Sequence, residues 1–264
     1  MSRIEARFAQ LRADGRKGFI PFVTAGDPDV EMSVAIVGRL AELGADLIEL
    51  GVPFSDPMAD GPTIQRSSQR ALANGTDLRA VLDIARRTRE KSDTPIVLFS
   101  YLNPLLRYGF DRLASDAADA GIDGVLITDV VDEEAAEFAS KLRSHDLDLI
   151  SLIAPTTSNE RLARIAAASS GFLYAIARAG VTGVAAEMGG EAEKLVRRAR
   201  SCSDLPIAVG FGVSMRAHVE DVWRYADAAV VGSAIVSEIE KAGGAAAVDR
   251  VETFVKGLLP QFAK

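Results

Sequence analysis

Cysteine is almost absent from this sequence of 264 residues, which contains Cys202 alone. A single cysteine cannot form a disulfide within the chain, and no cluster of cysteine and histidine offers ligands for a structural zinc ion. We therefore expect a protein of a reducing compartment that holds no metal.

Long apolar runs are absent as well. Nowhere do about 18 apolar residues follow one another, the length that a membrane-spanning helix needs. The N-terminal segment 1–18 also lacks the uninterrupted apolar stretch of a signal peptide. These absences predict a cytoplasmic protein without a membrane-embedded part.

An excess of positive charge is absent too, because the formal net charge is -7 and the isoelectric point is near 5.0. Binding a nucleic acid requires clustered lysine and arginine, so we expect no nucleic-acid partner. A small anion is still possible, since a few backbone amides at a helix start can hold one.

Two common catalytic arrangements have no support in the sequence. His145 and His218 fall in predicted surface helix segments, and no serine stands in a pattern with histidine and aspartate, so chemistry of the serine-hydrolase type is not supported. No lysine lies within the predicted strands, which disfavours a Schiff-base aldolase.

What the sequence does contain is a regular alternation of short apolar runs and longer amphipathic segments. Near-continuous apolar character is typical of parallel strands covered on both faces. The predicted strands are Phe19–Thr24, Leu47–Val52, Pro95–Tyr101, Gly124–Asp129, Asp148–Ala154, Phe172–Ala177, Pro206–Gly212 and Ala228–Ser233. The predicted helices are Val30–Leu43, Leu78–Lys91, Phe110–Ala120, Glu133–Ser144, Asn159–Ala168, Gly190–Ser201, Met215–Tyr225 and Ala245–Leu259.

This alternation predicts an α/β protein, a single (β/α)8 TIM barrel over residues 19–259. A further N-terminal helix over residues 2–14 has Ile4, Phe8 and Leu11 on one face and would cap the bottom of the barrel. No linker divides the chain, so residues 1–264 should form one domain. The alternative is an open, doubly wound sheet, which also alternates strands and helices.

In a TIM barrel the active site is built at the C-terminal ends of the strands, and this rule draws attention to Glu49. Its neighbours Ile48 and Leu50 are apolar, so the carboxyl group is expected to be buried. Burial raises the pKa of a carboxyl group toward neutrality, which suits a general acid or base. The alternative is a buried glutamate paired with a lysine or arginine.

The loop Pro53–Pro62 follows the same strand and contains Asp56 and Asp60. A long, acidic, proline-stiffened loop at the functional end of a barrel favours a binding element. Asp60 could accept a hydrogen bond from a substrate N–H group. The alternative for each aspartate is an ordinary turn or helix-capping residue.

Glycines recur at the ends of the last three predicted strands, in segments 178–183, 210–213 and 232–233. Barrels often bind phosphate with the loops after strands seven and eight and with a short helix, whose start we expect at 232–236. Because all three segments coincide with strand ends, a phosphate site is favoured over a set of tight turns.

Several of these segments resemble the tryptophan synthase α-chain family, with a match from about Phe19 to about Val236. The motifs that carry the resemblance are PFVTAGDPD at 21–29, ELGVPFSDPMADGPTIQ at 49–65, YLNPLLRYG at 101–109, RAGVTG at 178–183 and GFGVS at 210–214.

The resemblance implies that Glu49 and Asp60 are the catalytic carboxylates. It assigns the binding of a substrate phosphate to Gly183, Gly212, Gly232 and Ser233. It implies that the residues around the indole ring are Phe22, Phe99, Leu126, Thr128, Ile153, Tyr174 and Phe211.

The activity implied is the retro-aldol cleavage of indole-3-glycerol phosphate to indole and glyceraldehyde 3-phosphate. Glu49 would move the protons and Asp60 would stabilise the ring N–H as charge develops. The resemblance implies no cofactor in this chain and a partner β subunit that carries pyridoxal phosphate and receives the indole, in an α2β2 complex.

The segment 178–190 is rich in glycine and alanine, and we expect it to be mobile when the site is empty. Thr182 is the residue we expect to reach toward Asp60 or the ligand when this lid closes. The alternative is a flexible connection with no other role.

Two positions depart from the usual pattern of the family and bear on the contact with the β subunit. Val131 stands in a segment where the family usually has a proline, and Ala177 stands where serine is common. Three other functions remain: a lyase that acts without a partner, a subunit that only activates β, and another phosphate-binding barrel, an isomerase or synthase.

Overall fold

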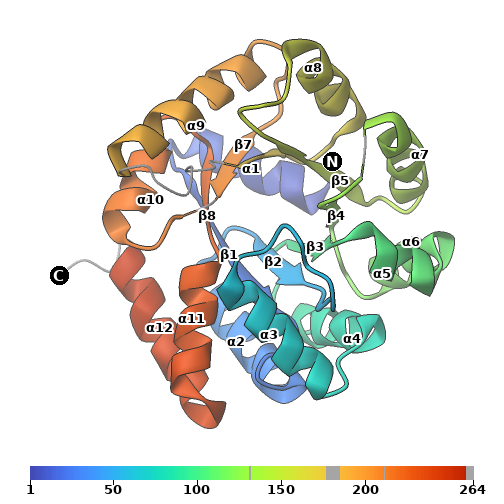
Figure 1. Cartoon of the computed structure of the whole chain (residues 1–264), viewed down its shortest axis with the longest axis vertical. Coiled ribbons are helices and arrows are strands. Elements are labelled where there is room, and N and C mark those ends of the chain that lie inside the picture. The colour runs from blue at the N-terminus through green and yellow to red at the C-terminus, as the bar shows by residue number, and fades with distance from the viewer. Residues whose placement is uncertain (131, 177–184, 211, 260–264) are drawn as a thin grey trace.

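The computed structural model describes residues 1–130, 132–176, 185–210 and 212–259. Within these residues, eight parallel strands form a closed barrel in the order β1 to β8, and helices surround it (Figure 1). Because β1 pairs with both β2 and β8, the sheet has no free edge. The predicted TIM barrel is confirmed, and the open sheet is wrong.

The strands lie within two residues of the boundaries that the apolar runs predict. They are β1 (Gly18–Thr24), β2 (Ile48–Gly51), β3 (Ile96–Ser100), β4 (Gly124–Ile127), β5 (Asp148–Ile153), β6 (Leu173–Ile176), β7 (Ile207–Gly210) and β8 (Ala228–Val231).

The eight predicted outer helices are also present. They are α2 (Val30–Glu42), α4 (Leu78–Arg89), α6 (Phe110–Asp119), α7 (Asp132–Arg143), α8 (Asn159–Ala168), α9 (Ala185–Arg200), α10 (Arg216–Trp223) and α12 (Ala247–Leu258). The predicted start of α9, at Gly190, is five residues too late. The stretch 185–190 was expected to belong to a loop, but its alanine, glutamate and methionine residues are good helix formers.

Three further helices lie at the C-terminal end of the barrel. α3 (Pro62–Ala73) follows the loop after β2, whereas α5 (Leu102–Tyr108) and α11 (Ser233–Ala242) stand directly after β3 and β8. The sequence indicated only the start of α11. A short 3-10 helix, η1 (Gly244–Ala246), joins α11 to α12. Among the described residues no helix is long and apolar enough to cross a membrane.

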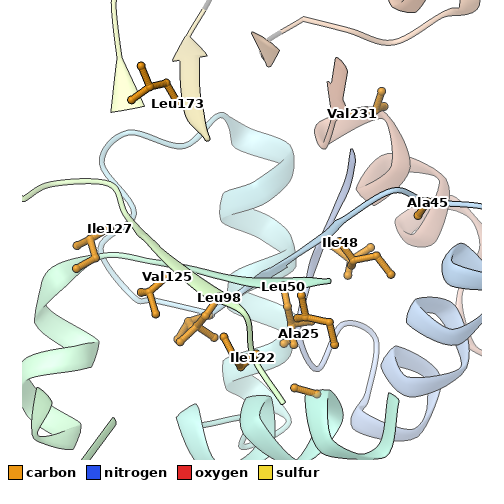
Figure 2. Close-up of a cluster of buried hydrophobic side chains, with 14 of the residues drawn as sticks. Ala25, Ala45, Ile48, Leu50, Leu98, Ile122, Val125, Ile127, Leu173 and Val231 are labelled. Atoms are coloured by element: carbon orange, nitrogen blue, oxygen red, sulfur yellow. The ribbon is translucent and has the colours of Figure 1, made fainter. Parts of the chain in front are cut away.

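Side chains alternate between the two faces of each strand and so form two apolar layers. Ile48, Leu50 and Leu98 point outward and pack in the layer between the strands and the helices (Figure 2). Leu47 and Val97 point into the barrel and pack in its interior. A polar residue at an inward position, such as Glu49, is therefore surrounded by the walls of the barrel.

The N-terminal end of the barrel is closed by α1 (Arg3–Ala13), as the sequence predicts. Ile4, Phe8 and Leu11 pack into the interior layer, and the ring of Phe8 lies 5.6 Å from that of Phe172. Ion pairs from α1 to the loops that precede β2 and β4 fix the helix in place: Arg7 to Asp46 and Arg3 to Asp123, at 2.5 and 2.9 Å. This end of the molecule serves stability.

Candidate active site

Glu49 lies in the middle of β2, opposite Phe22 of β1 and Val97 of β3. Its side chain has no solvent exposure. Neither carboxyl oxygen has a hydrogen-bond partner among the described residues. Burial raises the pKa of Glu49 well above its usual value. The alternative of a glutamate paired with a lysine or arginine finds no support in the described part of the chain, and a raised pKa suits a group that takes part in proton transfer.

Asp60 lies at the end of the loop after β2, one residue before Gly61, the N-cap of α3. Two contacts hold the loop here: the Gln65 side chain donates to the backbone oxygen of Asp60 at 2.9 Å, and the Ala59 N–H donates to the Tyr101 hydroxyl at 2.9 Å. The backbone around Asp60 is thus anchored to both α3 and the end of β3.

The carboxyl group of Asp60 has a pKa raised to about 6, because burial outweighs the hydrogen bond from Tyr101 that lowers it. Tyr174, in β6, has a pKa raised well above its usual value, first by burial and then by the charges of Glu49 and Asp60. The three groups therefore share one electrostatic environment. Asp56, the other acidic residue of the loop, is exposed.

A cavity of about 310 Å³ joins these residues at the C-terminal end of the barrel. Phe22, Phe99 and Tyr174 give it an aromatic wall, with ring centroids 5.3 Å apart for Phe22 and Phe99 and 6.4 Å apart for Phe99 and Tyr174. Glu49 and Asp60 line the same space. A flat aromatic molecule with one polar N–H group fits such a wall.

Backbone groups from the last two strands line the cavity as well. Gly212 has a φ of +73°, which favours glycine, and Gly232 and Ser233 begin α11. No side chain of the described residues caps α11, so the first N–H groups of this helix are available to an anion.

Of the predicted site residues, eight line this one cavity: Glu49, Asp60, Phe22, Phe99, Tyr174, Gly212, Gly232 and Ser233. Leu126 has no exposure and belongs to the interior layer of the barrel. Thr128 follows β4, and its buried hydroxyl has no partner among the described residues. Phe211, Thr182, Gly183, Val131 and Ala177 lie outside the described residues.

The structure contradicts the prediction for Ile153. Its side chain packs in the layer between the strands and the helices, whereas its neighbour Leu152 packs against the interior layer. Because consecutive residues of a strand point to opposite faces, an error of one residue exchanges the two environments. Leu152 therefore faces the interior of the barrel, as Ile150 of the same strand does.

Ile64 of α3, which is not among the predicted site residues, lines the cavity with Ala59 and Gly61. Pro62 at the first helical position was a signal that a helix starts there. Tyr101 was present in a recognised motif, but its contact with the Asp60 loop depends on tertiary structure.

The chain matches the sequence model of the family described as "Tryptophan synthase alpha chain" over residues 8–261. The chain belongs to the tryptophan synthase α-chain family. It is 49% identical to the tryptophan synthase alpha chain of Citrifermentans bemidjiense over 98% of this chain and 97% of that protein. It is also 49% identical to that of Burkholderia thailandensis, over 98% and 96%.

Solved structures of the tryptophan synthase α-chain family have the same fold. The tryptophan synthase subunit alpha of Legionella pneumophila matches with a TM-score of 0.90 at 36% identity, over 98% of this chain and 97% of that chain. A chain of tryptophan synthase from M. tuberculosis, in an aminoacrylate-bound form, matches with a TM-score of 0.88 at 37% identity, over 98% of both chains. The family acts in tryptophan biosynthesis as a lyase that cleaves indole-3-glycerol phosphate, and this is the activity of the chain.

Proposed function

We propose that Glu49 and Asp60 are the catalytic groups with which this chain cleaves indole-3-glycerol phosphate to indole and glyceraldehyde 3-phosphate. One observation carries the proposal. Two carboxyl groups with raised pKa values share a cavity of about 310 Å³ whose other lining residues include the first residues of α11. This arrangement provides proton transfer at the indole and an anion site for the phosphate.

The substrate would lie with its indole ring against Phe22, Phe99 and Tyr174 and its phosphate at Gly212, Gly232 and Ser233. The interior position of Leu152 makes it a further candidate for contact with the ring. We also keep Thr128, Leu126, Phe211 and Gly183 as proposed binding residues on the basis of the family resemblance.

The reaction then needs two proton transfers. A proton is added to indole C3, and the bond between C3 and the side chain breaks, so that its electron pair restores the aromatic ring. The side-chain hydroxyl next to this bond loses its proton and becomes the aldehyde of glyceraldehyde 3-phosphate. Burial raises the pKa of Glu49 from its usual value, which makes its carboxyl group better suited to giving and accepting a proton, and Glu49 is proposed for this role.

Asp60 would act on the charge that forms in between. Protonation at C3 makes the ring nitrogen positively charged, and a carboxylate that accepts the ring N–H then binds more strongly than it does to neutral indole. An interaction gained in the transition state increases the rate of reaction. The surrounding protein has a lower dielectric constant than water, which strengthens this attraction.

We propose no cofactor in this chain, because Glu49 and Asp60 supply the proton transfers and the charge stabilisation. We propose a β subunit with pyridoxal phosphate as partner, in an α2β2 assembly that passes indole between sites. The similarity to a chain of the M. tuberculosis tryptophan synthase in its aminoacrylate-bound form supports this partner.

The test is indole release from indole-3-glycerol phosphate by the purified chain and by Glu49→Gln. The glutamine keeps the shape of the side chain but cannot carry the proton, so kcat should fall on the order of 10²–10⁴-fold while the substrate still binds. Turnover within about tenfold of the wild type would remove Glu49 from the mechanism.

Asp60→Asn should lower kcat with a smaller effect on KM, because the interaction lost is made mainly in the transition state. Asp56→Asn is the matched control, since Asp56 is an exposed aspartate in the same loop. Equal losses for the two variants would contradict the role of Asp60. A wild-type chain that activates a β subunit but releases no indole itself would instead support a purely regulatory subunit.

A further inference from the structure

The two ends of the cavity belong to two helices that pack side by side, α3 and α11 (Figure 1). Asp60 immediately precedes the N-cap of α3, and the glycine and serine proposed for the phosphate begin α11. Ile64 from α3 and Val236 from α11 pack with Phe22 of β1 in one buried cluster. The relative placement of α3 and α11 therefore sets the distance between the indole end and the phosphate end.

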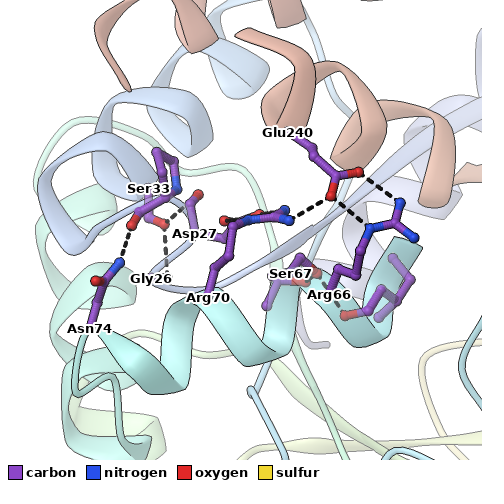
Figure 3. Close-up of polar contacts among 11 residues, drawn as sticks. Gly26, Asp27, Ser33, Arg66, Ser67, Arg70, Asn74 and Glu240 are labelled. Carbon is purple, nitrogen blue, oxygen red and sulfur yellow. Dashed lines mark hydrogen bonds and ion pairs between the residues drawn. The ribbon is translucent and has the colours of Figure 1, made fainter. Parts of the chain in front are cut away.

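One residue of α3, Arg70, binds two carboxylates from two different elements (Figure 3). Its Nε and Nη2 donate to the two oxygens of Asp27, both at 2.8 Å, in the loop after β1. Its remaining Nη1 donates to Glu240 of α11, also at 2.8 Å. The planar guanidinium thus spans β1, α3 and α11 in a fixed geometry.

Both partners of Arg70 are themselves held. Asp27 is only 1% exposed, and both of its carboxyl oxygens accept hydrogen bonds from Arg70. Glu240 also accepts hydrogen bonds from Arg66 at 2.7 and 2.8 Å. These arginines lower the pKa of Glu240 to about 2, and Glu240 therefore stays ionised throughout the neutral range.

A neutral contact fixes α3 to β1 on the side nearer the cavity. The hydroxyls of Thr24 and Ser67 lie 2.7 Å apart, and the Ser67 hydroxyl donates to the backbone oxygen of Ile64 at 2.8 Å. Arg70 lies one turn further along α3 than Ser67. The helix is thus held to β1 through Thr24 and to the loop after β1 through Asp27, while Arg66 and Arg70 provide its ionic link to α11.

We propose that Arg70 is a positioning residue for the reaction: by joining Asp27 to Glu240 it sets the separation between Asp60 and the start of α11, and so the fit of a substrate that occupies both ends at once. This inference rests on the proposed function. Its physical basis is that a displacement of about 1 Å in a substrate-positioning element can lower the rate on the order of 10²-fold.

The experiment compares ligands that occupy one end with a ligand that spans both. The probes are indole, glycerol 3-phosphate and indole-3-propanol phosphate, which contains both parts but cannot be cleaved. In Arg70→Met the affinities for indole and for glycerol 3-phosphate should stay within about threefold of the wild type, whereas that for the spanning ligand and kcat should each fall about tenfold or more. Arg70→Lys and Glu240→Gln keep the packing, so their kcat and their affinity for the spanning ligand should lie between those of the wild type and those of Arg70→Met.

Arg39→Met is the matched control, because Arg39 also joins an outer helix, α2, to a carboxylate of another, Glu252 of α12. It should leave kcat and all three affinities unchanged, even if it lowers the melting temperature. The inference is overturned if Arg70→Met and both milder variants match Arg39→Met, or if the loss for the spanning ligand equals the combined loss for the two fragments. Absence of indole release by the wild type would contradict the proposed function instead.

Discussion

Glu49 opposes folding in its charged form, and it is also the residue proposed for proton transfer. A carboxyl group that is fully buried and unpartnered in the described structure destabilises the barrel in its charged form. The same burial raises its pKa and prepares it for proton transfer. A stability measurement can therefore detect the property that the catalytic proposal needs.

Glu49→Gln should be more stable relative to the wild type at high pH than at low pH. The pKa of Glu49 is raised on folding, so below the unfolded value of 4.5 both states are protonated and the burial of the charge costs nothing. As pH rises from there to the folded pKa, the unfolded wild type releases a proton that the folded state retains, and the wild type loses stability. The variant has no such proton.

Thermal unfolding followed by circular dichroism from pH 4.5 to pH 8 tests this, because the difference in melting temperature should increase with pH. A difference that is constant over this range would mean that the pKa of Glu49 is not raised in the folded protein.

Tyr101 provides a second prediction for a single residue. Its hydroxyl lowers the pKa of Asp60, which burial holds at about 6. In the proposed mechanism the ionised form of Asp60 accepts the indole N–H, so kcat/KM should fall as pH decreases through this value. Tyr101→Phe removes the hydrogen bond and should shift the acid limb of the profile to higher pH.

Tyr108→Phe is the control for Tyr101→Phe, because Tyr108 donates a similar hydrogen bond to Asp116 on the surface, at 2.5 Å. Profiles of kcat/KM against pH for the isolated chain give the measurement. If Tyr101→Phe leaves the acid limb at the wild-type position, Asp60 is not the group that titrates there.

At the level of elements, the sequence was informative wherever burial imposes a pattern. Every strand is covered on both faces, and its apolar run predicts it to within two residues. The helices missed in the loops lack such a pattern. α5 has only seven residues, and α3 buries Ser67 and Ser68 against the barrel, where an apolar stripe would be expected. Of these two helices, α3 contributes Ile64 to the cavity.

Site residues were predictable where a motif marks them and less so where only strand register does. Glu49 and Asp60 stand in a long motif, and both line the cavity. The prediction names Ile153, but the neighbouring residue Leu152 faces the interior. An error of one residue in strand register therefore places the predicted residue in the outer layer. The contacts of Arg70 with Asp27 and Glu240 join residues far apart in the chain, and no local pattern predicts them.

The two faces of β5 lead to a prediction with its own internal control. Leu152→Ala should raise KM for indole-3-glycerol phosphate, because it changes the surface that faces the barrel interior near the proposed indole site. Ile153→Ala should instead lower the free energy of unfolding by about 2–5 kcal/mol with KM unchanged, since it leaves a cavity between strand and helices. Denaturant unfolding and steady-state kinetics on both variants separate the two effects. An increase in KM for Ile153→Ala alone would reverse the assignment of faces.

For the whole molecule, the structure divides stability and function between the two ends of the barrel. α1 and its ion pairs close the N-terminal end, and the cavity opens at the C-terminal end. The two ends have comparable buried aromatic residues: Phe8 is 4% exposed at the closed end, and Phe22 is 8% exposed at the cavity. Because Phe8 and Phe22 are buried to a similar degree, the same substitution, phenylalanine to alanine, can be compared at the two ends of the barrel.

Phe8→Ala and Phe22→Ala should differ in activity far more than in stability. Each removes a buried ring, which typically costs about 3–5 kcal/mol of folding free energy. Phe8 of α1 packs against Phe172 in the interior of the barrel, away from the cavity. Phe8→Ala should therefore keep the wild-type kcat/KM at temperatures where the variant remains folded. Phe22 packs against Phe99 and lines the cavity, so Phe22→Ala should lower kcat/KM by tenfold or more, because a truncated wall no longer holds the ring of the substrate against Glu49 and Asp60. The measurement is denaturant unfolding with indole release on the same preparations. Similar losses of kcat/KM in both variants would mean that the two ends of the barrel are coupled and that the division proposed here is wrong.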